Sequence, residues 1–265
     1  MTPPDFKVSY DQHIARLTLA RPAKRNAMTR ELLATVRDAV RDIPAHSDIR
    51  LLILEADGPV FCAGMDLVQM QSTAADPNSA DLWQYDAQLY CDVLLALWRL
   101  TIPTVAVVQG PAVAGGVGLA LACDLIVASE TATFSLPEPK RGITAAIVTP
   151  LLVHRIGSGA SAHLLLSGKV WDARLALQRG LCDELASPDT LRATVDSFAA
   201  SILTSSPDAL RLTKFQWRSV AAGAIPQQLT EAVKLSAQAR ETDDAREGLQ
   251  AFLEKRNPVW TEPKS

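Results

Sequence analysis

The stretch from Leu100 to Cys123, LTIPTVAVVQGPAVAGGVGLALAC, contains no charged side chain. A run of this length and apolarity could span a membrane. Two prolines, four glycines and Gln109 interrupt it, however, and nothing in lipid would satisfy the backbone groups that they free. The stretch therefore predicts three consecutive elements, a buried strand, a glycine-rich turn and a buried helix, at Thr104–Val108, Gly110–Gly116 and Val117–Cys123.

The helix predicted after the glycine-rich turn would begin with free backbone N–H groups. Together with the helix dipole, these groups can hold an anion or a developing negative charge. The junction is therefore a candidate oxyanion hole. A second strand-to-helix junction follows the apolar strand Leu51–Glu55, at Gly64-Met65-Asp66, and Asp66 falls in the first helical turn, where a carboxylate suits the dipole.

Composition excludes several classes of protein. The 265 residues are enough for a substantial core, in one large domain with an appendage or in two domains. Acidic residues outnumber Lys and Arg by 29 to 26 and no basic cluster stands out, so we expect no nucleic-acid partner. The four cysteines form no C-x-x-C pair and only four histidines are present, which argues against a zinc site and a disulfide framework. The N-terminal MTPPDFK lacks a signal-peptide pattern, so we expect a cytoplasmic protein. We also expect no bound metal and no membrane contact.

Strand patterns alternate with helical patterns up to about residue 186, and the pattern is helical from residue 188 onward. Thr29 is a plausible N-cap for the first helix. The small, polar segment Ser72–Ala80 is interpreted as a mobile loop or the edge of a lid. The other expected strands are Lys7–Tyr10, Ile14–Leu19, Leu51–Glu55, Leu125–Ser129, Thr133–Leu136 and Leu181–Leu185. The later expected helices are Ile143–Ile156, Ala160–Ser167, Leu191–Leu203, Asp208–Ala222, Pro226–Glu241 and Asp244–Arg256.

Three common functional motifs do not occur in the sequence. No G-x-x-x-x-G-K-[ST] P-loop is present. The dinucleotide fingerprint fails because Leu121 stands where a third small residue belongs. The G-x-S-x-G elbow of serine hydrolases is missing, since His163 follows Gly-Ala-Ser-Ala. The remaining features, backbone anion sites and isolated carboxylates, suit chemistry on an activated carbonyl group that the substrate carries.

The sequence resembles the enoyl-CoA hydratase/isomerase (crotonase) superfamily over nearly its whole length. Five segments carry the resemblance in order and at family-like separations: RPAKRNAM (21–28), FCAGMDL (61–67), VAGGVGLALACD (113–124), FSLPE (134–138) and EGLQAFLEKR (247–256). The resemblance implies an α/β fold, with a spiral of ββα units over residues 1–195 and an all-helical trimerisation region over residues 196–265. It also implies a homotrimer or a dimer of trimers.

The resemblance further implies roles for individual residues. The backbone N–H groups of Met65 and Gly115 would bind the thioester carbonyl oxygen and stabilise the developing enolate. Lys24 and Arg25 would contact the phosphates of coenzyme A, although alone they are typical of a solvated basic turn. The groove for coenzyme A would also include Ala63 and Asp66 on its adenine and loop side, and Phe252 and Lys255 at the nucleotide. Coenzyme A would be part of the substrate, and no separate cofactor is implied.

Family hydratases usually carry two glutamates across the enoyl group. Here the first position is Gly118, which can neither donate nor accept a proton, and the second is Glu138, held between Pro137 and Pro139. The prolines restrict the backbone and should fix the direction of the carboxylate. A single carboxylate with an oxyanion hole can move a double bond, and the same carboxylate could instead activate water for addition at C3. Chemistry alone slightly favours isomerisation.

The local resemblance favours hydration or dehydration. The segment AGGVGL and the later RGITAAIVTPLLVHRIG (141–157) are similar to the 3-methylglutaconyl-CoA hydratases and to the dehydratases of polyketide β-branching. These relatives imply a branched or carboxylated acyl group, carried by coenzyme A or by an acyl-carrier protein. We therefore expect a hydratase or dehydratase, with an enoyl-CoA isomerase and a non-catalytic acyl-CoA-binding protein as alternatives.

A second carboxylate on the substrate would need a cation. Lys140 and Arg141 are candidates, although they are also typical of a solvated pair that closes a turn. We expect His154 and His163 to be helix residues with satisfied nitrogens, without a catalytic role.

Overall fold

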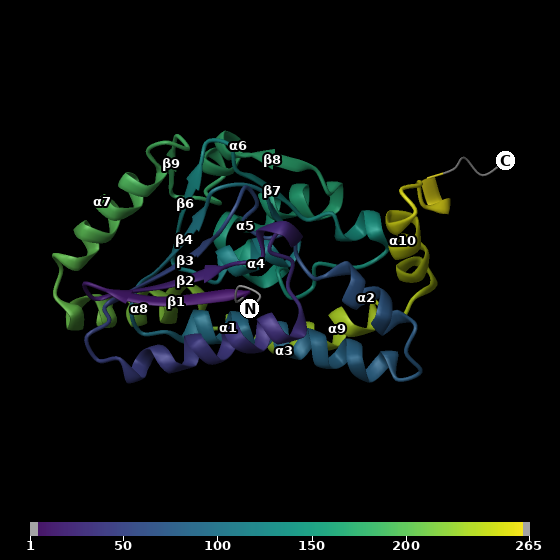
Figure 1. Cartoon of the computed structure of the whole chain (residues 1–265), viewed down its shortest axis with the longest axis horizontal. Coiled ribbons are helices and arrows are strands. Elements are labelled where there is room, and N and C mark those ends of the chain that lie inside the picture. Colours follow the sequence, from purple (N-terminus) through teal and green to yellow (C-terminus); the bar gives the residue numbers. More distant parts are fainter. Residues whose placement is uncertain (1–4, 262–265) are drawn as a thin grey trace.

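The computed structural model describes residues 5–261 and has a mixed α/β fold (Figure 1). Its central sheet has six strands in the order β1-β2-β3-β4-β6-β9. β1 and β2 pair antiparallel, and all other neighbours are parallel. The strands are β1 (Phe6–Asp11), β2 (Ile14–Leu19), β3 (Leu51–Ala56), β4 (Thr104–Val108), β6 (Leu125–Ser129) and β9 (Glu184–Ala186). β4 and β6 have the predicted bounds, whereas β9 begins later than predicted.

A second, three-stranded sheet holds β5, β7 and β8, of which β5 and β8 were not predicted. β7 pairs parallel with β5 and antiparallel with β8. These strands are β5 (Ala112–Val113), β7 (Thr133–Ser135) and β8 (Val170–Asp172). The helices are α1 (Arg30–Asp42), α2 (Leu67–Ala74), α3 (Ser79–Arg99), α4 (Gly115–Leu121), α5 (Thr149–Ser167), α6 (Ala173–Gln178), α7 (Leu191–Leu203), α8 (Pro207–Ala222), α9 (Ile225–Gln238) and α10 (Asp243–Leu253).

Both faces of the central strands β3, β4 and β6 are largely buried, as the apolar runs in these strands require. Val105 and Val107 of β4 point to one face and join a core with Val195 of α7. Ala106 and Val108 point to the opposite face and join the main core, which α1 and α3 help to form. Helices therefore cover the sheet from two sides (Figure 1).

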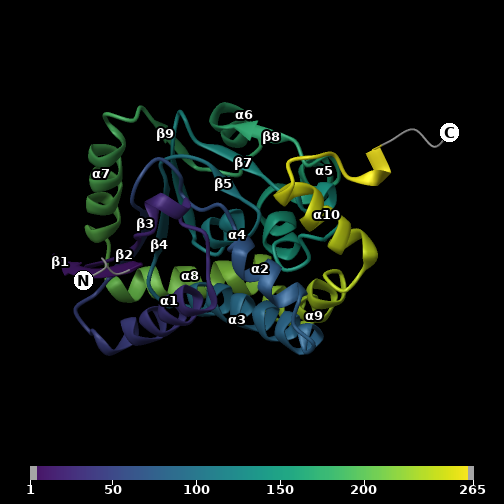
Figure 2. The same ribbon diagram turned by 45° about the vertical axis from the view of Figure 1, so that its right-hand side comes forward.

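The C-terminal part of the chain is helical, as predicted, and α9 and α10 lie at one end of the molecule (Figure 2). α9 packs along α3, and α10 packs against the short 3₁₀ segment Glu138–Arg141. The division expected between residues 195 and 196 falls inside α7 and stays a prediction. Within residues 5–261, no helix is long and apolar enough to cross a membrane.

The prediction of a loop over Ser72–Ala80 is wrong, because α2 extends to Ala74 and α3 begins at Ser79. The helix expected from Ile143 begins only at Thr149. The break expected between two helices at residues 157–159 is confirmed, because Gly157 has φ +74° and ψ 167° and divides α5 into two helical parts. Glycine adopts this positive φ without the steric cost of a Cβ.

Candidate active site

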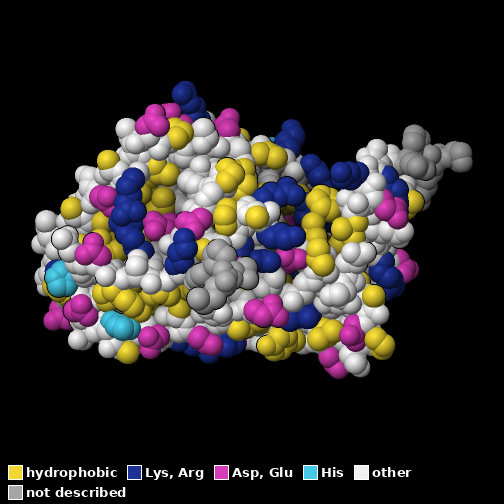
Figure 3. All heavy atoms as spheres, in the orientation of Figure 1, with side chains coloured by type: hydrophobic (Ala, Val, Ile, Leu, Met, Phe, Trp, Pro, Cys, Tyr) yellow, Lys and Arg dark blue, Asp and Glu magenta, His cyan; other side chains and the backbone are white. Residues whose placement is uncertain are grey.

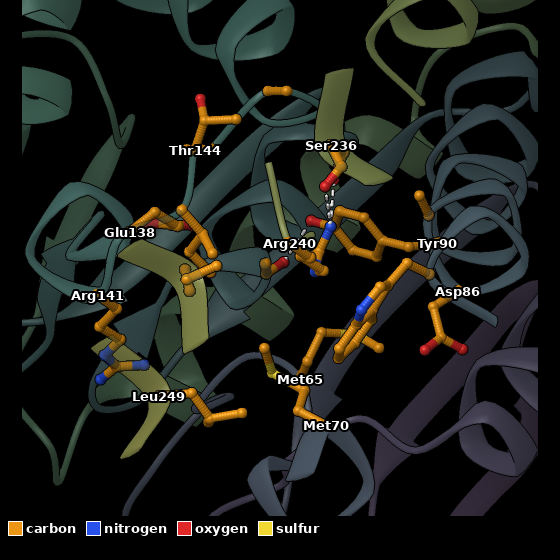
Figure 4. A pocket seen from close by; sticks show the side chains of 18 of the residues that line it. Met65, Met70, Asp86, Tyr90, Glu138, Arg141, Thr144, Ser236, Arg240 and Leu249 are labelled. Carbon is orange, nitrogen blue, oxygen red and sulfur yellow. Dashed lines mark hydrogen bonds between the residues drawn. The ribbon is translucent and has the colours of Figure 1, made fainter. Parts of the chain in front are cut away.

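A pocket lies where the two glycine-containing turns meet the C-terminal helices (Figure 4). Its walls come from α2, α3, the start of α4, residues 138–148, α9 and α10. In the orientation of Figure 1, basic and hydrophobic side chains lie next to one another on this side of the molecule (Figure 3). Six of the residues singled out in the sequence line the pocket: Ala63, Met65, Gly115, Glu138, Arg141 and Phe252. The other expected binding or catalytic positions do not line it: Lys24, Arg25, Asp66, Gly118, Lys140 and Lys255.

The two predicted junctions lie side by side. A Cβ built on Gly64, which has φ +89°, would be 3.6 Å from the backbone nitrogen of Gly115. The Met28 N–H donates to the Gly64 carbonyl (2.8 Å), and the Met28 carbonyl accepts from the Asp66 N–H (2.9 Å). The Met65 N–H lies between these two bonds. Within residues 5–261, neither Met65 nor Gly115 donates its backbone N–H to a hydrogen bond, so both groups are available to a ligand oxygen in the pocket.

The backbone before α4 is held in an unusual conformation. Ala114, the N-cap residue of α4, has φ +54° and ψ −126°, which is costly for a residue with a Cβ. Surrounding contacts hold it there: its N–H donates to the Ser135 carbonyl (2.9 Å), and the Val113 N–H donates to the Cys62 carbonyl (2.9 Å). A Cβ on Gly116 would lie 2.4 Å from that same Cys62 oxygen. Glycine is thus required for the close approach of the two turns.

Glu138 is a buried carboxyl group of the pocket and is only 6 % exposed. Its segment is anchored by a hydrogen bond from the Ile143 N–H to the Glu138 carbonyl (3.1 Å). The side-chain Oε2 has no hydrogen-bond partner among the described residues. Burial raises the pKa of Glu138 to about 7, and the positive charges of Arg141 and Arg240 oppose this rise. A carboxyl group poised near neutral pH can both accept and return a proton.

Tyr90 of α3 is a pocket residue that the sequence reasoning missed. Its hydroxyl donates to the Gly115 carbonyl (2.6 Å), and burial raises its pKa well above the usual value, so it stays protonated. A Cβ on Gly118 would lie only 2.0 Å from this hydroxyl oxygen. Tyr90 therefore fills the space beside Gly118. The signal available in the sequence was a tyrosine, an aromatic residue with a polar hydroxyl group, on the apolar face of a helix.

Arg240, just after α9, was also missed. Its Nη1 donates to the carbonyl oxygen (2.6 Å) and the Oγ (2.5 Å) of Ser236, one helical turn earlier. Asp86 of α3 lines the same pocket, and its two carboxylate oxygens accept from Arg30 at 2.5 and 2.8 Å. In the sequence Arg240 follows the last apolar residue of its helix and is typical of a solvated helix end.

The residues expected at the nucleotide lie outside the pocket or at its rim. Lys24 and Arg25 are exposed in a 3₁₀ turn, and Lys255 is exposed after α10. Asp66 is engaged in the fold, because its Oδ1 accepts from the N–H groups that begin α2 (3.1 and 3.3 Å) and its Oδ2 contacts Arg21 (3.3 Å). Phe252 stacks under the Arg141 guanidinium, 4.2 Å from the ring centroid. Their contacts with coenzyme A stay predictions.

The two cations proposed for a substrate carboxylate differ. Lys140 donates its Nζ to the Gly168 carbonyl (2.9 Å) and turns away from the pocket, whereas Arg141 lines it. His154 lies between two tryptophans, and His163 accepts from the Trp171 indole (3.2 Å). Neither histidine lines the pocket.

Comparison with known proteins agrees with this geometry. The family model described as enoyl-CoA hydratase/isomerase matches residues 9–263. A Thermus thermophilus protein named as a putative enoyl-CoA hydratase is 34 % identical over 246 residues, covering 93 % of this chain and 96 % of that protein. The crystal structure of an enoyl-CoA hydratase from Mycobacterium avium superposes with a TM-score of 0.87 at 29 % identity, covering 98 % of this chain and 100 % of that one. The protein is therefore a member of the enoyl-CoA hydratase/isomerase family.

Proposed function

We propose that the protein hydrates a 2-enoyl thioester, or dehydrates a 3-hydroxyacyl thioester, with Glu138 as its single acid and base. The observation that carries this proposal is the unpartnered carboxyl oxygen of Glu138 in the same pocket as the unbonded N–H groups of Met65 and Gly115. A proton-transfer group and an oxyanion site in one pocket are the parts that such a reaction requires.

In hydration, the Glu138 carboxylate takes a proton from water as the water oxygen bonds to C3. The electron pair of the C2–C3 double bond moves to form an enolate, and the negative charge gathers on the thioester oxygen. The N–H groups of Met65 and Gly115 would donate to that oxygen; losing one such donor costs about 3–4 kcal/mol. Glu138 then returns the proton to C2. Dehydration follows the same steps in reverse.

An enoyl-thioester isomerase is the second candidate. The pocket holds a second carboxylate, Asp86, but both its oxygens are paired with Arg30. One free carboxyl group suffices to move a proton between C2 and C4, whereas hydratases commonly use two carboxyl groups for proton transfer. This observation favours isomerisation, and the local resemblance to single-glutamate hydratases favours hydration.

The carrier of the acyl group is proposed to be coenzyme A. Lys24 and Arg25 would meet its phosphates, and Phe252 and Lys255 would contact its nucleotide. An acyl-carrier protein would present the same thioester without the nucleotide. The same acyl group offered on both carriers distinguishes them, since only the coenzyme A thioester gains from these contacts.

The test is an incubation of the purified protein with a trans-2-enoyl-CoA and, separately, with a 3-enoyl-CoA. Mass spectrometry and the absorbance of the enoyl thioester report the products. A gain of one water from the 2-enoyl thioester supports hydration, and a shift of the double bond at constant mass supports isomerisation. Binding of both thioesters without turnover would leave a non-catalytic acyl-CoA-binding protein as the remaining reading.

A further inference from the structure

The hydroxyl oxygen of Tyr90 is a hydrogen-bond acceptor that the fold leaves unused. A phenolic hydroxyl has one proton to donate and lone pairs that can accept. The proton of Tyr90 is committed to the Gly115 carbonyl oxygen (2.6 Å), and burial holds it on the phenol by raising the pKa. No group within residues 5–261 donates a hydrogen bond to the Tyr90 oxygen. Tyr90 lines the pocket, and Figure 4 shows it on the side opposite Glu138.

The Tyr90 oxygen also fills the space in front of Gly118. It would lie 2.0 Å from a Cβ at that position and 3.3 Å from a Cβ at Gly115, one helical turn earlier. The resemblance places the first glutamate of family hydratases at Gly118. The oxygen therefore stands where the side chain of that glutamate would begin, and it can accept a hydrogen bond as a carboxylate does.

The other side-chain acceptors of the pocket are less suited to hold a water opposite Glu138. Both oxygens of Asp86 and the Oγ of Ser236 already accept from arginines of the chain, at 2.5 to 2.8 Å. Thr144 makes no side-chain hydrogen bond in the part of the chain that the structure describes, but Figure 4 shows it on the same side as Glu138. Its hydroxyl can also rotate, whereas the bond to Gly115 fixes the Tyr90 hydroxyl.

We infer that the Tyr90 hydroxyl oxygen accepts a hydrogen bond from the water that adds to C3 and so orients its attack. In dehydration it would accept from the 3-hydroxyl group that leaves. The inference rests on the proposed function, because it requires that Glu138 catalyses hydration. Acceptors on two sides of a water fix the directions of both its O–H bonds and aim a lone pair at C3.

The two protons of the water have different fates. Glu138 takes one as the water oxygen bonds to C3 and the C2–C3 double bond becomes the enolate, and it then returns this proton to C2. The other proton stays on the same oxygen, hydrogen-bonded to Tyr90, and becomes the proton of the 3-hydroxyl product. Tyr90 keeps its own proton throughout, so it orients water without acting as an acid or a base.

The test compares two reactions of the same site, only one of which adds water at C3. The first is hydration of a trans-2-enoyl-CoA. The second is exchange of the C2 proton of a saturated acyl-CoA in D₂O, followed by mass spectrometry, which requires Glu138 and the oxyanion donors alone. Tyr90→Phe should lower kcat for hydration about 10-fold and change the exchange rate less than about 3-fold, as expected for one lost hydrogen bond to the reacting water. Thr144→Val removes the other unbonded hydroxyl and is the matched control; it should leave both rates within about 3-fold of the wild type.

Three outcomes would overturn the inference. Equal loss of both reactions in Tyr90→Phe would show that the bond to Gly115 maintains the site as a whole and that the hydroxyl does not act on water. Unchanged hydration in Tyr90→Phe would remove the role of Tyr90 and leave the proposed function of Glu138 intact. A wild-type protein that adds no water, with or without C2 exchange, would contradict the proposed hydration and the water-orienting role together. Circular dichroism and thermal unfolding of each variant separate these results from misfolding.

Discussion

The hydroxyl of Tyr90 donates a 2.6 Å hydrogen bond to the Gly115 carbonyl and ties helix α3 to the start of α4. The same oxygen would lie 2.0 Å from a Cβ at position 118, where the resemblance places the first glutamate of family hydratases. The packing of this chain therefore leaves no room for a side chain at Gly118. Introducing a glutamate there would require α3 to change as well.

Gly118→Ala should lower the free energy of unfolding by about 1–3 kcal/mol, because the new methyl group overpacks the core against Tyr90 and Val148. In a Tyr90→Phe background the nearest ring atom, Cζ, is 3.3 Å from that position, so the same substitution should cost less. Urea denaturation of the four proteins in this double-mutant cycle measures the coupling. If the two substitutions lowered the free energy of unfolding additively, the predicted contact between residue 118 and the Tyr90 hydroxyl would be wrong.

Glu138→Gln should lower kcat by at least about 100-fold, because it keeps the shape of the side chain and removes its ability to transfer a proton. Affinity for a saturated acyl-CoA should change less than about 3-fold, since the oxyanion donors are backbone groups. Steady-state kinetics and calorimetry measure the two effects. Turnover equal to that of the wild-type protein would show that Glu138 is not the base.

The pH dependence should follow the ionisation of Glu138. Both directions of the proposed reaction begin with the carboxylate form, and burial raises the pKa of this group to about 7. The value of kcat/KM should therefore fall about tenfold per pH unit well below pH 7 and level off above about pH 8. Arg141→Gln removes a positive charge that opposes the rise, so the midpoint should move to higher pH. A profile that is flat between pH 5.5 and 8 contradicts this role for Glu138.

Gly248→Ala should displace α10 from the segment that carries Glu138. A Cβ at this position would lie 2.2 Å from the Arg141 carbonyl oxygen, a backbone atom that cannot swing aside. We expect kcat/KM to fall at least about tenfold and proteolysis of the C-terminal helix to accelerate. Gly159→Ala in α5 is the matched control, because its Cβ would meet no atom within 4 Å. If both substitutions changed kcat/KM equally, the contact between α10 and the Glu138 segment would not matter for the site.

We also predict that the protein assembles as a trimer or a dimer of trimers. Helix α8 exposes large apolar side chains, with Phe215 68 % and Val220 77 % exposed, and such surfaces usually meet a partner. Sedimentation velocity should give a trimer or hexamer. Val220→Glu should shift it toward the monomer, while Gln216→Glu adds the same charge to a neighbouring polar position. A wild-type monomer at micromolar concentration contradicts the prediction.

The sequence alone was sufficient for the parts of the site that depend on local order. Apolar runs bounded by glycine and proline predicted β4, β6 and a helix after the glycine-rich turn, although α4 begins at Gly115, two residues before the predicted start. The junction at Met65 was predicted from the glycine that follows the strand β3. These features could be predicted because strand burial and positive-φ turns leave a signature within a few residues. The helices α7 and α8 were predicted almost to the residue for the same reason.

The tertiary structure decided which side chains enter the pocket. Tyr85 and Tyr90 lie on the same helix, α3, yet Tyr85 is 54 % exposed while Tyr90 is buried against α4. Arg240 reaches the pocket only because α9 packs along α3, which ends more than 120 residues earlier in the chain. Helical phase and the docking of distant helices depend on the sum of many packing contacts, which no short segment encodes. The turns of the site can therefore be predicted from the sequence, whereas the fold decides which side chains from distant helices line the pocket.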